Sequence, residues 1–234
     1  EWAGKMHDDL LDAVDWAVAE GIADRDRIAI HGGSYGGYAT LVGLTYTPDV
    51  FACGVDIVGP SNLITLLESI PPYWAPMLQV FKDRVGDPTT DAGREFLASR
   101  SPLTYADRIR RPLLIGQGAN DPRVKQAESE QIVAAMESHG IPVTYVLFPD
   151  EGHGFAEPAN RLSFFAVTEA FLAEHLQRRV RVGERGRLGT HHQQGLLRRA
   201  DEEQHVVANA CADVDEQNVE VLFELVDRRD QPEP

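Results

Sequence analysis

The chain has 234 residues, which is long enough for one sizeable domain with a buried core. Its apolar content of 43% and charged content of 25% are ordinary for a soluble globular protein. A formal net charge of −15 argues against nucleic-acid binding, which needs a basic face, and against docking on an anionic membrane.

The first 46 residues read as helix, strand, tight turn and helix. Residues 5–20 place apolar side chains at helical spacing, and Gly21 follows as a stop signal. Residues 27–31 are a short apolar run that indicates a buried strand. That run enters a glycine-rich turn at residues 32–37, and residues 38–46 then read as a helix.

The same alternation continues to residue 176. Further buried strands are expected at residues 52–58, 112–115 and 142–148, and further helices at residues 126–139 and 159–176. The stretch 61–96 reads as rich in loops. Strands that alternate with helices indicate parallel crossover connections, so we expect an α/β fold with a parallel sheet that is buried on both faces.

The composition changes near Gln177. Residues 178–199 hold seven arginines and one acid, whereas residues 200–234 hold eleven acids and two arginines. Segregated charge with weak periodicity is typical of a disordered or loosely docked tail, so we expect a domain of residues 1–177 and a separate tail of residues 178–234. Within this tail, residues 219–225 place apolar side chains at every second position and read equally as a strand or a helix.

Residues 32–36 read GGSYG and fit the pattern G-x-S-x-G around Ser34. In this pattern the glycines permit a sharp, strained turn that presents the serine hydroxyl at the end of a strand. The amide of Tyr35, at the start of the next helix, would point at a developing oxyanion. A plain glycine turn is the alternative for the pentapeptide alone, but its position between a buried strand and a helix favours a nucleophile.

A serine nucleophile needs a base and an orienting acid. In the α/β-hydrolase fold, the acid and then the histidine follow the serine, each after a later strand. Asp121 comes just after one predicted strand and His153 just after the next. Because open parallel sheets gather functional groups at the carboxyl ends of their strands, we expect Ser34, Asp121 and His153 to form a catalytic triad.

Three motifs carry a resemblance to a known family: GGSYGG at residues 32–37, DPRV at 121–124 and GHGF at 152–155. Together with the opening EWAGKMHDDL, they resemble the catalytic domain of the prolyl oligopeptidase family, especially its acylaminoacyl-peptidase and dipeptidyl-peptidase-like members. The resemblance covers about residues 1–177. It implies a serine-type peptidase in which Ser34 attacks a peptide carbonyl, with His153 as base and Asp121 as orienting acid.

The resemblance also implies substrate-binding residues. Arg123 matches a family arginine that binds a backbone carbonyl of the peptide substrate. Val124 and Trp74 match positions that line the apolar pocket for the residue before the cleaved bond. The match of Trp74 rests on spacing inside a loop, and ordinary packing of that loop is its alternative. No metal or other cofactor is expected, because the sequence lacks convincing ligand spacing and nucleotide-binding motifs.

The sequence departs from the family at its N-terminus. Family members carry a β-propeller and several further strands upstream, so we expect an N-terminally truncated, partial α/β-hydrolase fold whose nucleophile strand is an exposed edge. The upstream part would also supply a tyrosine as second oxyanion donor. An esterase of the same fold and a non-catalytic fragment are the alternatives to a peptidase. Two cysteines, Cys53 and Cys211, are too few for a disulfide framework and indicate a cytoplasmic location.

Overall fold

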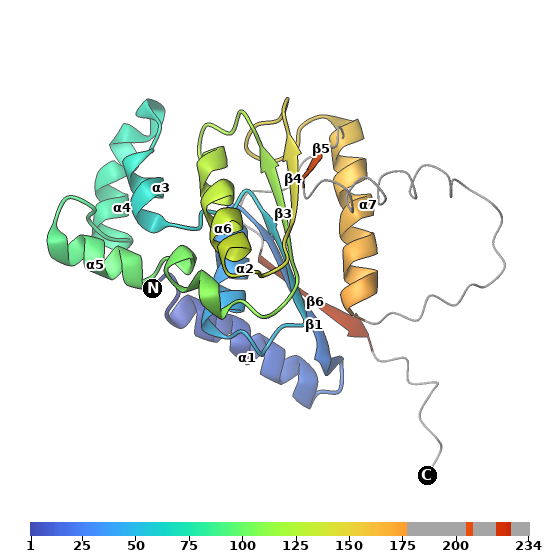
Figure 1. Cartoon of the computed structure of the whole chain (residues 1–234). Helices are drawn as coiled ribbons and strands as arrows, with labels where there is room; N and C mark the ends of the chain where they lie inside the picture. The colour runs from blue at the N-terminus through green and yellow to red at the C-terminus, as the bar shows by residue number, and fades with distance from the viewer. Residues whose placement is uncertain (177–204, 208–218, 226–234) are drawn as a thin grey trace, which may run out of the picture.

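The computed structural model describes residues 1–176, 205–207 and 219–225. These residues form a three-layer α/β arrangement in which helices cover both faces of one sheet (Figure 1). The strands run across the sheet in the order β5-β4-β3-β2-β1-β6. None of the helices in this part of the chain is long and apolar enough to cross a membrane.

Four parallel strands form the centre of the sheet: β1 (Ala23–Gly33), β2 (Cys53–Ile57), β3 (Leu113–Gly118) and β4 (Thr144–Phe148). They confirm the four strands and the parallel sheet expected from the apolar runs. The register places Gly32 of β1 beside Asp56 of β2, and Asp56 beside Ile115 of β3. The carboxyl ends of these strands therefore meet at one end of the sheet.

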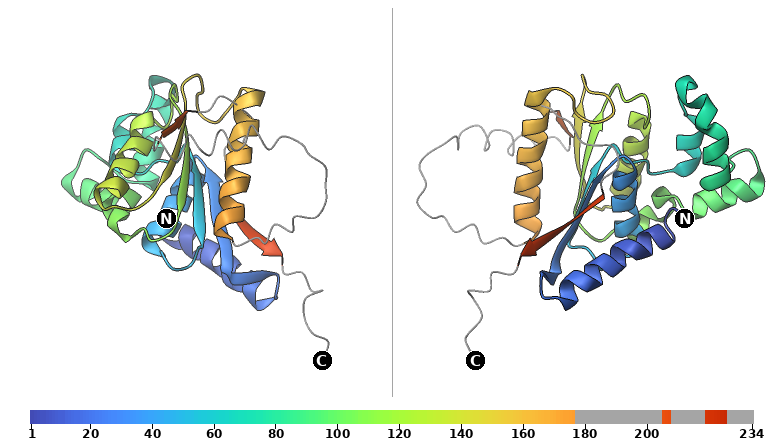
Figure 2. Two further views of the ribbon diagram at one scale, coloured as in Figure 1. Left: turned by 45° about the vertical axis from the view of Figure 1, so that its right-hand side comes forward. Right: turned by 180° about the vertical axis from the view of Figure 1, so that it is seen from behind.

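Helices α1 (Lys5–Ala19), α2 (Tyr35–Tyr46) and α6 (Gln126–Ser138) cover one face of the sheet, and α7 (Pro158–His175) covers the other (Figure 2). Alternate side chains of each strand supply the two cores. Ile28 and Ile30 of β1 pack toward the first three helices, whereas Ala29 between them packs toward the core that includes Phe164 of α7. The four helices expected from the sequence are confirmed within a few residues.

The stretch expected to be rich in loops is largely helical. It contains α3 (Leu63–Glu68), η1 (Pro72–Met77), α4 (Leu78–Arg84) and α5 (Asp91–Ser99), and η2 (Pro102–Arg108) follows. Side-chain caps begin two of these helices, because Asn62 accepts a hydrogen bond from the amide of Ile64 and Thr90 accepts one from the amide of Gly93. Each helix is too short for an apolar period to show over several turns, which explains why the sequence pattern missed them.

Two strands of the C-terminal part extend the sheet. β5 (His205–Val207) pairs parallel with β4, and β6 (Val219–Leu225) pairs antiparallel with β1. Residues 219–225 are therefore a strand, one of the two structures that their pattern allowed. The expectation that β1 is an exposed edge is wrong, because backbone hydrogen bonding to β6 occupies that side of the strand. The remaining expectations for residues 178–234 fall outside the described residues, and the boundary after residue 177 stays a prediction.

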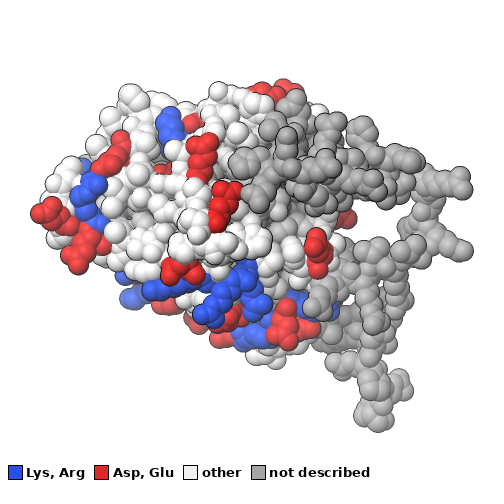
Figure 3. Space-filling view, in the orientation of Figure 1, with Lys and Arg blue, Asp and Glu red and all other residues white. Residues whose placement is uncertain are grey.

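Charged side chains are mixed on the face of the molecule that Figure 3 shows. Lys and Arg along the lower part of this face are interspersed with Asp and Glu, and much of the centre is uncharged. The described residues on this face thus form no continuous basic surface.

Candidate active site

Ser34 lies between the last residue of β1 and the first residue of α2. Its backbone has φ 56° and ψ −114°, an unusual conformation that costs about 1–3 kcal/mol in a residue with a side chain. The sharp turn requires glycine at position 32, since a Cβ atom there would lie 2.5 Å from the carbonyl carbon of Gly36. The amide of Ser34 donates a hydrogen bond to the carbonyl of Ile57 in β2, at 2.8 Å. This turn therefore holds the serine hydroxyl at the carboxyl end of the sheet.

The loop after β4 brings His153 to the serine. Nε2 of His153 lies 2.9 Å from Oγ of Ser34, and the histidine side chain is only 7% exposed. The next residue, Gly154, has φ 86°, a conformation that favours glycine and turns the chain toward α7.

The loop after β3 places Asp121 on the other side of the imidazole. Oδ2 of Asp121 accepts a hydrogen bond from Nδ1 of His153 at 2.7 Å. Oδ1 accepts two backbone hydrogen bonds, from Arg123 at 2.8 Å and from Val124 at 2.9 Å. Because the carboxylate holds Nδ1 as the protonated nitrogen, Nε2 is free to accept the proton of the Ser34 hydroxyl. The structure thus brings the three predicted residues into one hydrogen-bonded chain.

Glu151 supports the histidine loop, and the sequence patterns did not single it out. Its carboxylate is buried and accepts hydrogen bonds from the amides of Ala156 at 2.8 Å and Glu157 at 3.0 Å. The side chain of Asn160 donates a third bond at 2.7 Å. These bonds fix the loop to the N-terminal turn of α7, where a carboxylate is electrostatically favourable.

Tyr35 is the first residue of α2, as expected for an oxyanion donor. The hydrogen bond from the amide of Tyr38 to the carbonyl of Ser34, at 3.1 Å, is the first bond of this helix. The amide of Tyr35 therefore has no carbonyl partner within α2 and belongs to the electropositive helix N-terminus.

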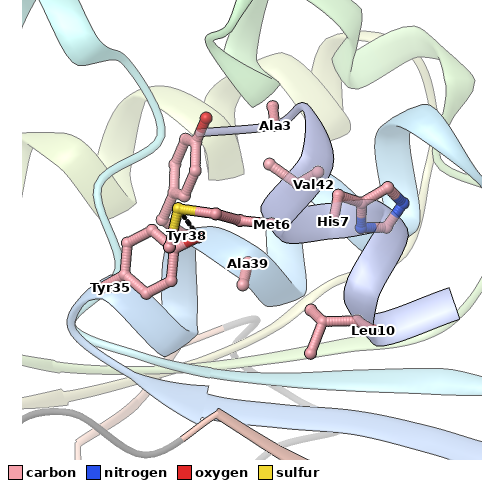
Figure 4. Close-up of a pocket in the computed structure, with 8 residues that line it drawn as sticks. All are labelled: Ala3, Met6, His7, Leu10, Tyr35, Tyr38, Ala39 and Val42. Carbon is pink, nitrogen blue, oxygen red and sulfur yellow. Dashed lines mark hydrogen bonds between the residues drawn. The ribbon is translucent and has the colours of Figure 1, made fainter. Parts of the chain in front are cut away.

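The side chain of Tyr35 turns away toward α1. Figure 4 shows it at a narrow crevice between α1 and α2, where its hydroxyl donates to Sδ of Met6 at 3.6 Å. His7 on the same crevice bonds the hydroxyl of Thr47 at 3.0 Å, and burial lowers the pKa of His7. His7 is therefore part of the packing between the helices and lies apart from the Ser34–His153 pair.

The three predicted substrate-binding residues lie in one region. The guanidinium carbon of Arg123 is 5.6 Å from the centre of the Trp74 ring, a cation–π contact. Trp74 also stacks on Phe81 of α4, with ring centres 5.9 Å apart. Val124 is only 4% exposed and packs in a core cluster with Tyr38 and Leu63. The structure thus brings Trp74 to Arg123, whereas the side chain of Val124 is almost fully covered.

Glu128 at the start of α6 bonds the segment at the start of α3, which leads on to Trp74. Oε2 accepts hydrogen bonds from the amides of Ser61 at 3.0 Å and Asn62 at 2.9 Å, and Oε1 accepts one from the hydroxyl of Thr65. Gln131 donates another at 2.8 Å. Desolvation of the buried carboxyl raises its pKa, and these hydrogen bonds oppose the rise. No local sequence pattern indicates this role of Glu128, because most of its partners lie more than 60 residues away.

Asp56 is a third buried carboxyl, after Glu151 and Glu128, that the sequence patterns did not single out. It lies in β2, and its Oδ1 accepts a hydrogen bond from the amide of Gly59 at 2.8 Å. Burial raises its pKa to about 7, although the Gly59 bond acts in the opposite direction. A charged residue inside the apolar run 52–58 is the one signal that could have drawn attention to it.

No group of three or more His, Cys, Asp and Glu residues within the described part of the chain is arranged to hold a metal ion.

The fold and the chain order of Ser34, Asp121 and His153 define an α/β hydrolase. The chain belongs to the prolyl oligopeptidase family, whose sequence model matches residues 1–179. This match confirms the resemblance inferred from the three motifs.

Two curated relatives illustrate the match. Dipeptidyl aminopeptidase BIII of Pseudoxanthomonas mexicana is 70% identical over 176 residues, which cover 75% of this chain and 26% of the relative. Dipeptidyl peptidase family member 6 of Caenorhabditis elegans is 58% identical over 177 residues, which cover 75% of this chain and 24% of the relative. The chain thus spans about a quarter of the length of these relatives.

Solved structures agree with the fold. A puromycin-hydrolyzing peptidase of Mycobacterium tuberculosis superposes with a TM-score of 0.63 at 34% identity, over 75% of this chain and 26% of that one. An acylaminoacyl peptidase in complex with Z-Gly-Gly-Phe-chloromethyl ketone superposes with a TM-score of 0.66 at 26% identity, over 80% of this chain and 29% of that one.

Proposed function

We propose that this chain carries the catalytic site of a serine-type peptidase that cleaves peptide bonds through an acyl-enzyme. The observation that carries the proposal is the continuous hydrogen-bonded chain from Ser34 Oγ to His153 and on to Asp121, at 2.9 Å and 2.7 Å. Ser34 is inert at neutral pH without such a base, and the strained turn aims its hydroxyl away from the sheet.

The proposed reaction has two halves. Oγ of Ser34 attacks the peptide carbonyl while its proton moves to Nε2 of His153, and the resulting oxyanion is bound by the amide of Tyr35. Collapse of this intermediate breaks the C–N bond, and His153 gives its proton to the leaving amine. Water then attacks the acyl-enzyme by the same proton path and releases Ser34. Asp121 stays ionised and stabilises the imidazolium.

We assign peptide binding to Arg123 and the neighbouring aromatic surface. Arg123 would donate to a backbone carbonyl of the peptide, and Trp74 would form one wall of the apolar pocket for the residue before the cleaved bond. The contact between these two side chains supports a joint role. We assign Val124 to support the floor of that pocket from below, since its side chain is almost fully covered and packs with Tyr38 and Leu63. The relatives named as dipeptidyl peptidases support short peptides as substrates.

We further propose that the complete protein resembles its longer relatives in having an upstream β-propeller domain. The support is that the match covers only about a quarter of each relative.

We also propose a cytoplasmic location, which the low cysteine content supports.

Two measurements test the proposal. A fluorophosphonate probe should label the folded chain at Ser34, and Ser34→Ala should abolish labelling and leave only about 10³–10⁴-fold acceleration over water. Peptide anilides and short acyl esters should then be compared by kcat/KM. Faster turnover of esters with no cleavage of anilides would favour an esterase, since a peptidase must protonate an amine leaving group. A folded chain that the probe does not label would refute the proposed function and favour a non-catalytic fragment.

A further inference from the structure

Asp56 is the most deeply buried carboxyl next to the candidate active site. It has no exposed surface, and its neighbours across the sheet are Gly32 of β1 and Ile115 of β3. Oδ1 accepts the amide of Gly59, but Oδ2 has no hydrogen-bond partner among the residues that the structure describes. An ionised carboxyl in this environment is costly, because burial removes the hydration of its charge. A buried acid that the triad does not use requires another explanation.

The carboxyl of Asp56 lies between two glycines that contact the turn around Ser34. Gly37 belongs to the first turn of α2, and Gly59 follows the end of β2. A side chain at either glycine would collide with Oδ1 of Asp56, and a Cβ atom on Gly37 would also lie 2.7 Å from the Cα atom of Gly59. The carboxyl therefore fits tightly against the helix that begins at the nucleophile.

The turn that Asp56 closes also carries the hydrogen bond to the nucleophile. Between Asp56 and Gly59, Val58 has φ 48°, which is a strained conformation for a β-branched residue. Its amide donates to the carbonyl of Gly116 at 2.9 Å, and the preceding carbonyl, of Ile57, accepts the amide of Ser34 at 2.8 Å. Two strained residues, Ser34 and Val58, thus lie at the ends of neighbouring strands, and Ser34 bonds the carbonyl of the residue before Val58.

We propose that Asp56 is a positioning residue for the nucleophile: by accepting the Gly59 amide, its carboxyl holds the turn whose Ile57 carbonyl fixes the backbone of Ser34. The inference rests on the proposed function, in which Ser34 is the attacking residue. The role requires an acceptor oxygen at Oδ1 and does not require a negative charge. An Asn side chain at position 56 should therefore preserve the position of the nucleophile, whereas an Ala side chain should not.

The test compares Asp56→Ala with Asp56→Asn in the full chain. Thr45→Val is the matched control, because Thr45 is equally buried on α2. Its hydroxyl bonds carbonyls within the helix, of Leu41 at 2.7 Å and Val42 at 3.4 Å. The measurements are the rate constant of fluorophosphonate labelling, and kcat and KM on a peptide anilide, with folding checked by circular dichroism.

Asp56→Ala should lower the labelling rate and kcat by about 10- to 100-fold at nearly unchanged KM, since displacement of a reacting group by about 1 Å has effects of this size. Asp56→Asn and Thr45→Val should stay within about threefold of the parent. If Asp56→Ala is unfolded in buffer, sucrose will favour its folded state, and labelling should remain slow there.

Parental labelling of folded Asp56→Ala would overturn the inference, as would equal loss in folded Asp56→Asn. Failure of the proposed function is a different result, namely that the parent is not labelled or that Ser34→Ala still is.

Discussion

Replacing Asp56 by Asn should remove a large pH dependence from the stability of the fold. The native state holds the Asp56 carboxyl fully buried with a pKa of about 7, against an ordinary value of 3.8. Folding therefore favours the protonated form, and the native state binds more protons than the unfolded state between these two values. The free energy of unfolding should consequently fall as the pH rises from about 4 to about 7 and level off above that.

The expected size of this effect follows from the difference between the two pKa values. A difference of about 3 pH units, at about 1.4 kcal/mol per unit, corresponds to about 4 kcal/mol of unfolding free energy. This is a large share of the roughly 5–15 kcal/mol that stabilises an ordinary domain. The Asn side chain resembles the neutral acid, so Asp56→Asn should match the parent near pH 4 and exceed its stability by up to about 4 kcal/mol at pH 8.

Urea unfolding followed by circular dichroism at several pH values between 4 and 8 will measure this difference. Asp87→Asn is the control, because hydrogen bonds from Thr89, followed by Lys82, lower the pKa of the partly exposed Asp87 to about 2. The stability that Asp87 contributes is present above its ordinary pKa and is lost as the pH falls toward 2, outside the window of Asp56. Parallel pH profiles for the parent and Asp56→Asn would refute the reasoning.

Three further substitutions test other parts of the molecule. Asp121→Asn should leave the fold intact and lower kcat by up to about 10⁴, through the wrong imidazole tautomer, whereas a change confined to KM would contradict the assigned role. Glu128→Ala should leave the Ser61 and Asn62 amides without their acceptor and so loosen the segment that leads to Trp74. KM for a peptide anilide should therefore rise by about tenfold or more, with a smaller effect on kcat. Phe164→Ala should lower the free energy of unfolding by about 3–5 kcal/mol in urea titrations, since Phe164 is fully buried against Phe148 and Phe155.

The sequence could predict those features whose signals are local. Apolar runs located the four central strands, and the motif around Ser34 together with the positions of Asp121 and His153 after successive strands located the hydrogen-bonded triad. Asp56 and Glu128 could not be assigned a role in this way. Their environment depends on which strands are neighbours and on partners that are distant in sequence, and neither is visible in a local pattern.

The surroundings of the nucleophile strand illustrate the same limit. The alternation in residues 219–225 permitted a strand, but alternation does not identify the neighbouring strand. Pairing with β1 depends on an unoccupied side of that strand, which is a property of the assembled sheet. The short helices between β2 and β3 are similar, because their caps at Asn62 and Thr90 are visible only once the backbone is known.

Because β6 pairs antiparallel with β1, any other strand would have to compete with β6 for that side of β1. A strand can pair with only one neighbour on each side, and β2 holds the other side of β1. Any upstream strand that joins the sheet beside β1 must therefore exchange with β6, and the two arrangements exclude each other. Because the backbone of β1 leads directly into Ser34, such strand exchange would take place in the strand that immediately precedes the nucleophile turn.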